Sequence, residues 1–366
     1  MINKDLFAKS LLVTGGCGFI GSNFIRRTIE MHPDWYIVNL DALTYAGNPA
    51  NLSDLIHHPA YRFVQGDICD SALMDGLFHS TAFDGIVHFA AESHVDRSIH
   101  GPKAFIQTNV IGTCTLLEAF RRSWEERKRP AHLRFLHVST DEVYGSLGPQ
   151  GHFTETTPYD PSSPYSASKA GSDHLVNAWH RTYGLPALIT NCSNNYGPYQ
   201  FPEKLIPLMV LNILEEKPLP VYGDGQNVRD WLYVIDHCDA LLTVLEKGTP
   251  GETYNIGGNQ ERRNIDIVNL LCQLLDRKLD RPAARSSRRL IQFVPDRPGH
   301  DRRSAIAAAK IKAQLGWQPA HTFESAITET VDWYLNSMEW VNTIRSGEYR
   351  AWIDKNYGKR AGGLVG

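Results

Sequence analysis

The sequence predicts an α/β protein with a doubly wound parallel sheet and a smaller carboxy-terminal lobe. Six short apolar runs in the first half alternate with longer amphipathic stretches. Several of these runs are nearly continuous in hydrophobic residues, as strands covered on both faces are. Helical segments between such strands are typical of βαβ units, and right-handed crossovers place helices on both faces of the sheet. The predicted strands are 11–14, 36–40, 62–64, 85–89, 134–138 and 187–190.

Two of the intervening helices have ends that can be predicted. One is expected from 108 to about 122, where apolar residues recur at helical spacing. The other begins near Pro164, which suits the first helical position, with Ser162 or Ser163 as its cap. Gly184 is expected to end it.

The second half of the chain differs in composition from the first. Proline and glycine recur at short intervals from about residue 195, and no low-complexity linker or internal repeat separates the two halves. We therefore expect residues 1–195 to form the α/β domain. Residues 196–366 are expected to form mainly a lobe over the carboxyl end of the sheet, with a segment near 230–260 returning to the first domain.

The bulk composition is that of an ordinary globular protein. The net charge of −3 over 366 residues gives no electrostatic reason to expect a nucleic acid or an anionic membrane as partner. No run approaches the roughly 18–20 apolar residues of a membrane span, and residues 1–10 lack the apolar core of a secretory signal. Six widely spaced cysteines without a CxxC pair indicate free thiols and a cytoplasmic location. The histidines form no recognisable ligand motif, so no metal is expected.

A glycine-rich loop follows the first predicted strand. Gly15, Gly18 and Gly21 permit a tight turn, close approach of a pyrophosphate and close packing of helix on strand. The second strand ends at Asp41, where a carboxylate can bind both hydroxyls of an adenosine ribose and repel a 2′-phosphate. Asp67, after the third strand, is placed either to reach the adenine or to cap a helix. These residues predict a Rossmann-type domain that binds NAD rather than NADP.

A tyrosine and a lysine lie one turn apart on the helix that begins near Pro164. Tyr165 and Lys169 are residues i and i+4, so their side chains project from one helix face. A nearby ammonium and a positive nicotinamide would lower the tyrosine pKa from about 10. Tyr165 could then take a proton from a sugar hydroxyl during oxidation, while Lys169 holds the nicotinamide ribose.

Two adjacent carboxylates follow the fifth predicted strand. Thr140, Asp141 and Glu142 lie at the edge where open α/β sheets bind ligands. A structural interpretation makes Asp141 a turn cap and Glu142 a surface charge. In the functional interpretation, two carboxyl groups close together resist simultaneous ionisation, which yields one acid and one base. Such a pair beside a nicotinamide indicates transient oxidation in the service of an elimination.

The G-x-x-G-x-x-G loop with a downstream Tyr-x-x-x-Lys resembles the extended short-chain dehydrogenase/reductase family over nearly the whole chain. The Thr-Asp-Glu segment further resembles that of the nucleotide-sugar 4,6-dehydratases, especially those acting on dTDP-glucose. Matching segments are 43–48 (LTYAGN), 90–98 (AAESHVDRS), 229–234 (RDWLYV) and 296–301 (DRPGHD). One departure is Ala42, where many relatives place a lysine.

The resemblance implies a reaction in three steps. Tyr165, helped by Thr140, would remove the 4-hydroxyl proton as carbon 4 is oxidised. Glu142 would then remove the proton on carbon 5 while protonated Asp141 donates to the departing hydroxyl on carbon 6. Reduction of carbon 6 would yield a 4-keto-6-deoxy sugar and regenerate NAD, with Lys169 beside the cofactor throughout.

The resemblance also implies further contacts. Additional residues expected around the cofactor are Phe19, Ile20, Leu43, Thr44, Ile68, Ala90, Ala91, Ser93, Thr108 and Asn195. Residues expected around the nucleotide sugar are Ser93, Thr140, Asn194, Lys204, Leu205, Tyr222, Arg229, Asn264, Arg297 and His300. The two arginines and His300 suit a diphosphate, with structural salt bridges as the alternative for the arginines. The helices near 108–122 and 164–183 would pair into a homodimer.

Three alternative functions stay open on the sequence. A UDP-glucose 4,6-dehydratase would share these motifs, because the residues that read the base are not resolved. A nucleotide-sugar 4-epimerase is less compatible, since it needs no acid/base pair for loss of water. An NAD-binding regulatory protein would keep the glycines but lose the reacting groups, and the intact Asp141, Glu142 and Tyr165 argue against it.

Overall fold

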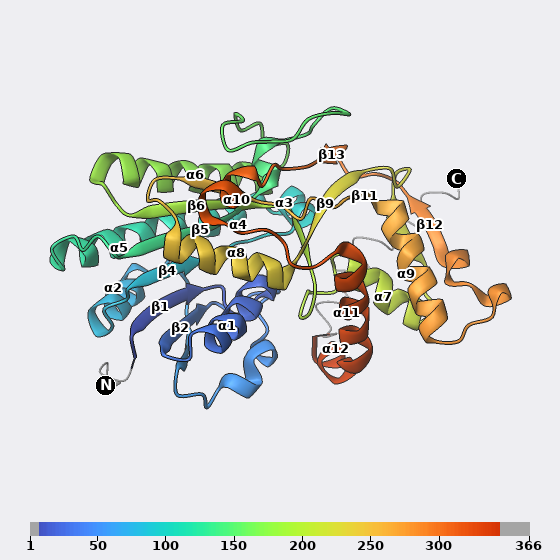
Figure 1. Ribbon diagram of the computed structural model, residues 1–366, viewed down its shortest axis with the longest axis horizontal. Coiled ribbons are helices and arrows are strands. Elements are labelled where there is room, and N and C mark those ends of the chain that lie inside the picture. The colour runs from blue at the N-terminus through green and yellow to red at the C-terminus, as the bar shows by residue number, and fades with distance from the viewer. Residues whose placement is uncertain (1–6, 345–366) are drawn as a thin grey trace.

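The structure is a computed structural model that describes residues 7–344 (Figure 1). Outside the described residues lie 1–6 and 345–366, which are the outer ends of the two predicted domains. Residues 1–6 are also part of the segment considered as a secretory signal. Among the described residues, no helix has the length and apolarity needed to cross a bilayer. The same part of the chain contains no cluster of three or more His, Cys, Asp or Glu suited to a metal ion.

A seven-stranded sheet forms the centre of the larger part of the molecule, and all its strand pairs are parallel. The six predicted strands are all present. Their order, β10-β6-β5-β4-β1-β2-β3, reverses direction between β1 and β4, which is where open sheets of this kind bind ligands. The strands are β1 (Lys9–Thr14), β2 (Trp35–Asp41), β3 (Tyr61–Gln65), β4 (Gly85–His88), β5 (Arg134–Thr140), β6 (Ala187–Cys192) and β10 (Thr253–Ile256).

Helices cover both faces of this sheet (Figure 1). Leu11 and Val13 of β1 belong to the same buried core as α1 and α8, whereas Leu12 packs with α2, α5 and α6. Successive strand residues point to opposite faces, so burial of both faces explains why the apolar runs are nearly continuous. The covering helices are α1 (Phe19–Met31), α8 (Val234–Lys247), α2 (Ser71–Ser80), α5 (Thr113–Glu126) and α6 (Pro164–Tyr183).

The predicted ends of α6 are confirmed. Ser163 caps the helix by accepting the N–H of Ser166, and Pro164 occupies the first turn. Gly184 ends the helix in the left-handed conformation, at φ +75°. The helix predicted from 108 to 122 is longer in the structure, because shorter helical segments lead into α5. These segments are α3 (Val95–His100), α4 (Pro102–Phe105) and the π-helical η3 (Ile106–Gly112).

The remaining elements build a smaller lobe around β9 (Val228–Tyr233). This strand pairs with β7, β11 and β13, and β8 pairs with β12. Apolar side chains of α7, α9, α11 and α12 form a separate core beneath them. The lobe's strands and helices are β7 (Asn194–Tyr196), β8 (Leu219–Tyr222), β11 (Glu261–Arg263), β12 (Ile291–Val294), β13 (Arg303–Ser304), α7 (Leu205–Leu214), α9 (Asn264–Lys278), α11 (Phe323–Asn336) and α12 (Met338–Ile344).

Helix α10 (Ala309–Leu315) and several 3₁₀ turns complete the described part of the chain. Helix α10 packs against α8 and β10, so the chain returns to the sheet domain near its end. The 3₁₀ turns are η2 (Pro49–Leu55), η4 (Asp141–Tyr144), η5 (Ala283–Arg285) and η6 (Ser287–Leu290).

Candidate active site

Two adjoining cavities lie at the carboxyl ends of the parallel strands. The first, of about 310 Å³, is bounded by the glycine loop, the ends of β2, β4 and β5, and one face of α6. The second, of about 160 Å³, lies between β9, α7 and the loop near residue 297. Residues that line both cavities are Glu142, Asn194, Asn195, Gln200, Glu203 and Lys204.

The glycine loop has the geometry of a phosphate-binding turn. Gly15 adopts φ +72°, and a Cβ there would lie 2.6 Å from the backbone nitrogen of Ala90, so glycine is required. Helix α1 begins at Phe19 with no side-chain cap at Gly18 and no acidic residue in its first turn. Its first N–H groups and positive dipole end therefore face the cavity, an arrangement that fits the pyrophosphate of a dinucleotide.

Asp41 is fixed at the wall of the first cavity. Its Oδ1 accepts the N–H of Leu43 at 2.8 Å, and its Oδ2 accepts the N–H of Cys17 at 2.9 Å. Burial raises the pKa of this carboxyl, and the two backbone N–H groups oppose the rise. Leu43 itself is not among the residues that line this cavity, although its neighbours Ala42 and Thr44 are, so its contact with the cofactor stays a prediction.

Asp67 lines the same cavity after β3. Its Oδ1 accepts the N–H of Cys69 at 2.8 Å, whereas α2 is capped by Asp70. The alternative that Asp67 is a helix cap is therefore wrong, and its carboxylate is positioned at the end of the cavity predicted for adenine.

Tyr165 and Lys169 lie together in the wall of the first cavity, as the helical spacing predicts. Lys169 Nζ donates to the carbonyl of Val138 at 2.9 Å. Burial, reinforced by the charge of Glu142, raises the pKa of Tyr165 well above its usual value. The prediction that this pKa is lowered is wrong as far as the protein's own side chains are concerned. Their net effect raises it, because desolvation disfavours the phenolate. A positive nicotinamide would act in the opposite direction.

The two adjacent carboxyl groups lie in different environments. Asp141 is 2% exposed, and burial together with the charge of Glu142 raises its pKa to about 8. Burial also raises the pKa of Glu142, but nearby cations oppose the rise: Arg297, Lys204 and Arg229. Asp141 is therefore protonated at neutral pH, while the cations favour the carboxylate of Glu142.

The turn that carries this pair is held by Thr140 at the end of β5. Thr140 Oγ1 accepts the N–H of Glu142 at 3.2 Å and donates to Asp141 Oδ1 at 3.4 Å. The cap of the 3₁₀ turn η4 is thus Thr140. The structural interpretation, in which Asp141 caps the turn, is therefore wrong. The other oxygen of Asp141 is buried without a hydrogen-bond partner among the described residues, as a group awaiting a ligand would be.

The pKa of Asp141 predicts how an elimination step depends on pH. Asp141 can donate only while protonated, so we expect the rate of elimination to fall as the pH rises through about 8. Rapid-quench measurement of the elimination rate between pH 6.5 and 9.5 would show this decline. A rate constant that rises across that interval would contradict protonated Asp141 as the donor.

The two arginines of the second cavity make no salt bridge with a carboxylate in the described part of the chain. Arg229 Nη1 and Nη2 donate to the carbonyls of Val228 and Asp301, at 2.8 and 2.7 Å. Arg297 Nε is buried without a hydrogen-bond partner among the described residues. Their charges are thus not neutralised by direct ion pairs, so the salt-bridge alternative is wrong. His300 also lines this cavity and contacts Asp296 Oδ1 at 2.6 Å.

The structure brings nearly all the predicted site residues to these cavities. Those lining the first are Gly15, Gly18, Phe19, Ile20, Gly21, Asp41, Thr44, Asp67, Ile68, Ala90, Ala91, Ser93, Thr108, Thr140, Asp141, Glu142, Tyr165, Lys169 and Asn195. Those lining the second are Asn194, Lys204, Leu205, Tyr222, Arg229, Asn264, Arg297 and His300.

Glu203 was missed by the sequence analysis although it lines both cavities. It is 4% exposed, and its Oε2 lies 3.7 Å from His94 Nε2 and 3.5 Å from Arg97 Nε. Burial raises its pKa to about 7. Glu203 belongs to an irregular loop that has no periodic pattern, and its one signal was its place beside Lys204.

The Rossmann-type fold, the glycine loop and the Tyr/Lys pair define the extended short-chain dehydrogenase/reductase class. A family model described as GDP-mannose 4,6 dehydratase matches residues 12–330. The dTDP-glucose 4,6-dehydratase of Xanthomonas campestris pv. campestris (strain B100) is 59% identical over 342 residues, covering 93% of this chain and 97% of that protein.

Two solved structures are similar over most of the chain. The dTDP-glucose 4,6-dehydratase of Bacillus anthracis, in complex with NAD, has a TM-score of 0.83 and 48% identity, covering 92% of this chain and 100% of that one. The Streptomyces venezuelae dTDP-glucose 4,6-dehydratase, with NAD and TYD bound, has a TM-score of 0.84 and 46% identity, with the same coverage. The chain belongs to the GDP-mannose 4,6 dehydratase family and, within it, to the dTDP-glucose 4,6-dehydratases.

Proposed function

We propose that this protein converts dTDP-glucose to dTDP-4-keto-6-deoxyglucose, as an NAD-dependent 4,6-dehydratase. The observation that carries the proposal is the pair of adjacent carboxyl groups of Asp141 and Glu142, which lie in different environments within one cavity that also contains Tyr165 and Lys169. The pair supplies an acid and a base for loss of water, and the relatives' names and bound ligands agree with this chemistry.

The first cavity is suited to NAD. The glycine loop and the start of α1 would hold the pyrophosphate, and Asp41 would accept hydrogen bonds from the adenosine ribose. Lys169 would contact the nicotinamide ribose. When bound, NAD supplies a reversible oxidation, taking a hydride from carbon 4 of the sugar and returning it to carbon 6.

The chain's own residues would carry the protons. Tyr165, with Thr140 beside it, takes the proton of the 4-hydroxyl. A ketone at carbon 4 acidifies the proton on carbon 5, which Glu142 removes. Asp141 donates its proton to the hydroxyl that leaves carbon 6, so that water departs.

The second cavity would hold the nucleotide. Arg229 and Arg297 present cationic groups without carboxylate partners among the described residues, which suits a diphosphate. Lys204 and Asn194 lie between the two cavities and would orient the sugar. Binding energy gained on the nucleotide would hold the reacting carbons beside Glu142.

Three further features belong to the proposal: assembly, location in the cell and domain bounds. The chain would act as a homodimer paired through the helices near 108–122 and 164–183, where Ile106, Ile111 and Tyr183 are exposed apolar side chains. It would act in the cytoplasm, since all six cysteines are free thiols. Residues 1–195 would form the NAD-binding domain and 196–366 mainly the substrate lobe, with residues near 230–260 shared.

Presenting dTDP-, UDP- and GDP-glucose side by side tests the substrate assignment. We expect the purified protein to form the 4-keto-6-deoxy product from dTDP-glucose with the highest kcat/KM and without an added reductant. Absence of product from dTDP-glucose, with saturating NAD and folded protein, would contradict the proposal. A higher kcat/KM with UDP-glucose would establish the UDP-specific alternative instead.

A further inference from the structure

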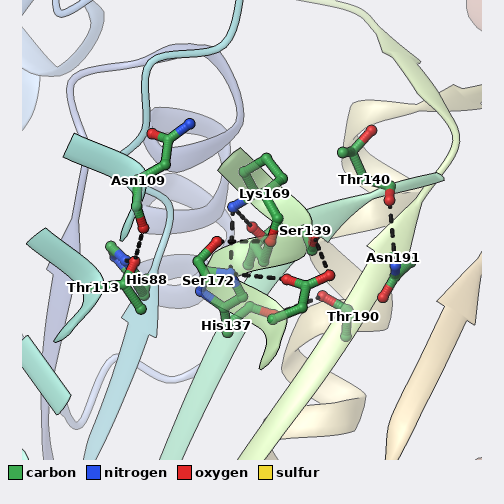
Figure 2. A network of polar contacts seen from close by, with 12 residues as sticks. His88, Asn109, Thr113, His137, Ser139, Thr140, Lys169, Ser172, Thr190 and Asn191 are labelled. Carbon is green, nitrogen blue, oxygen red and sulfur yellow. Dashed lines mark hydrogen bonds and ion pairs between the residues drawn. The ribbon is translucent and has the colours of Figure 1, made fainter. Parts of the chain in front are cut away.

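A buried polar network surrounds the ammonium of Lys169 (Figure 2). Lys169, His137 and Asp173 are only 4%, 1% and 0% exposed. Lys169 Nζ lies 3.4 Å from His137 Nε2, and the same ring nitrogen lies 3.2 Å from Asp173 Oδ1. A single imidazole nitrogen therefore separates a buried ammonium from a buried carboxylate.

Asp173 extends the four-residue spacing of Tyr165 and Lys169 on α6. Tyr165, Lys169 and Asp173 follow one another at intervals of four residues on α6, so their side chains lie along one helix face. Asp173 is one turn beyond Lys169 and is not used by the steps proposed above. A carboxylate this deeply buried is costly unless it is paired and hydrogen-bonded.

The carboxylate of Asp173 is held rigidly. Its Oδ2 accepts the hydroxyl protons of Ser139 at 2.8 Å and Tyr159 at 3.0 Å. Ser139 directly precedes Thr140, and Asn191 Nδ2 donates to both Tyr159 Oη and the carbonyl of Thr140. The network thus ties the helix carrying Tyr165 and Lys169 to the strand end that carries the acid/base pair.

Other titratable groups around this ammonium are neutral. Burial holds the pKa of His88 and of His137 well below the usual range, and it raises the pKa of Cys192 to about 12. Tyr165 also remains protonated, because burial raises its pKa. The groups facing Lys169 are His88 on β4, His137 on β5, Tyr165 and Asp173 on α6, and Cys192 on β6.

Asp173 is the one anion of this set. Burial lowers the pKa of Lys169, and the charge of Asp173 is the largest influence that raises it. Reciprocally, burial raises the pKa of Asp173 to about 6, and the charge of Lys169 opposes the rise. At neutral pH Asp173 is therefore ionised, and its charge favours the protonated form of Lys169.

We propose that Asp173 is the buried counterion that keeps Lys169 protonated and in position. Asp173 would act through Lys169 rather than on the substrate, so it is a positioning residue. This role deepens the proposed function, because a charged Lys169 is what would hold the nicotinamide ribose and favour ionised Tyr165.

The Asp173→Asn substitution tests the proposal. Asparagine keeps the shape and can accept the same hydrogen bonds from Ser139 and Tyr159, but it removes the charge. We expect the pKa of Lys169 to fall by about one to three units. It would be measured by NMR titration of the full chain labelled with ¹³C at lysine Cε, with the Lys169 resonance identified by its absence in Lys169→Met.

Tyr159→Phe is the matched control. It removes a hydrogen bond from the same carboxylate and leaves the charge, so Lys169 should titrate nearly as in the unchanged protein. An unchanged pKa in Asp173→Asn would overturn the proposal, as would an equal fall in both variants. The titration requires no turnover, so it stays informative even if the assignment of the reaction fails.

A second variant tests the pair in the other direction. Removing the ammonium in Lys169→Met should raise the pKa of Asp173 above about 6. A carboxyl whose pKa is raised by folding contributes stability at low pH, and this contribution is lost as the pH rises through the folded value. The free energy of unfolding, measured with urea, decreases between the unfolded and the folded pKa of this carboxyl. In Lys169→Met this decrease should therefore continue to a higher pH than in the unchanged protein. Parallel profiles would overturn the proposal.

Discussion

Glu142→Gln is expected to stop elimination while leaving oxidation of the sugar intact. Glutamine preserves the size of the side chain but cannot accept the proton from carbon 5. Loss of a general base lowers a rate by about 10²- to 10⁴-fold, so product formation should fall by that factor. Absorbance of the reduced nicotinamide on the enzyme should meanwhile increase when dTDP-glucose is added, because the 4-keto sugar is formed but not dehydrated.

Two comparisons make this experiment specific. Glu126→Gln changes an exposed glutamate at the end of α5 that lines neither cavity, and it should leave turnover unchanged. If Glu142→Gln released the 4-keto-6-deoxy product at the normal rate, Glu142 would not be the base. If it abolished the absorbance increase as well, Glu142 would be needed for oxidation, contrary to its proposed role.

Tyr165→Phe is expected to block the first step. Phenylalanine fills the same space but cannot accept the 4-hydroxyl proton, so neither reduced nicotinamide nor product should form at an appreciable rate. We expect turnover to fall by about 10²- to 10⁴-fold, as for Glu142→Gln, but with no absorbance increase. Stopped-flow absorbance after mixing with dTDP-glucose distinguishes the two variants.

Tyr36→Phe provides a matched Tyr-to-Phe control. Tyr36 is buried on β2, and its hydroxyl has no hydrogen-bond partner among the described residues, so its removal should cost little. Normal oxidation in Tyr165→Phe would show that another group takes the proton. Reduced activity in Tyr36→Phe would show that loss of any buried hydroxyl disturbs the site.

The sheet could be predicted from the sequence because each central strand is buried on both faces. Runs such as 36–40 are therefore apolar apart from a single residue, Asn39, and the Ser163 cap and Gly184 stop mark α6 equally well. The glycine loop, Asp41 and the Tyr165–Lys169 spacing were predictable for a related reason. Each depends on local backbone geometry, which leaves a pattern in neighbouring residues.

The features that the sequence did not predict depend on contacts between residues far apart in the chain. The raised pKa of Tyr165 results from burial by several elements, which the sequence spacing of Tyr165 and Lys169 does not reveal. Glu203 lies in an irregular loop, where no periodic pattern marks it. The counterion proposed for Lys169 joins α6 to β5 through His137, which no local pattern indicates.

In the proposed function, one site oxidises the sugar, removes water and reduces the sugar again. This function is tested most directly by supplying dTDP-glucose carrying deuterium on carbon 4, with no added reductant, and locating the isotope in the product by NMR. We expect deuterium on carbon 6 of the 4-keto-6-deoxy sugar, because the hydride removed from carbon 4 is the one returned. Product with only solvent-derived hydrogen on carbon 6 would contradict it.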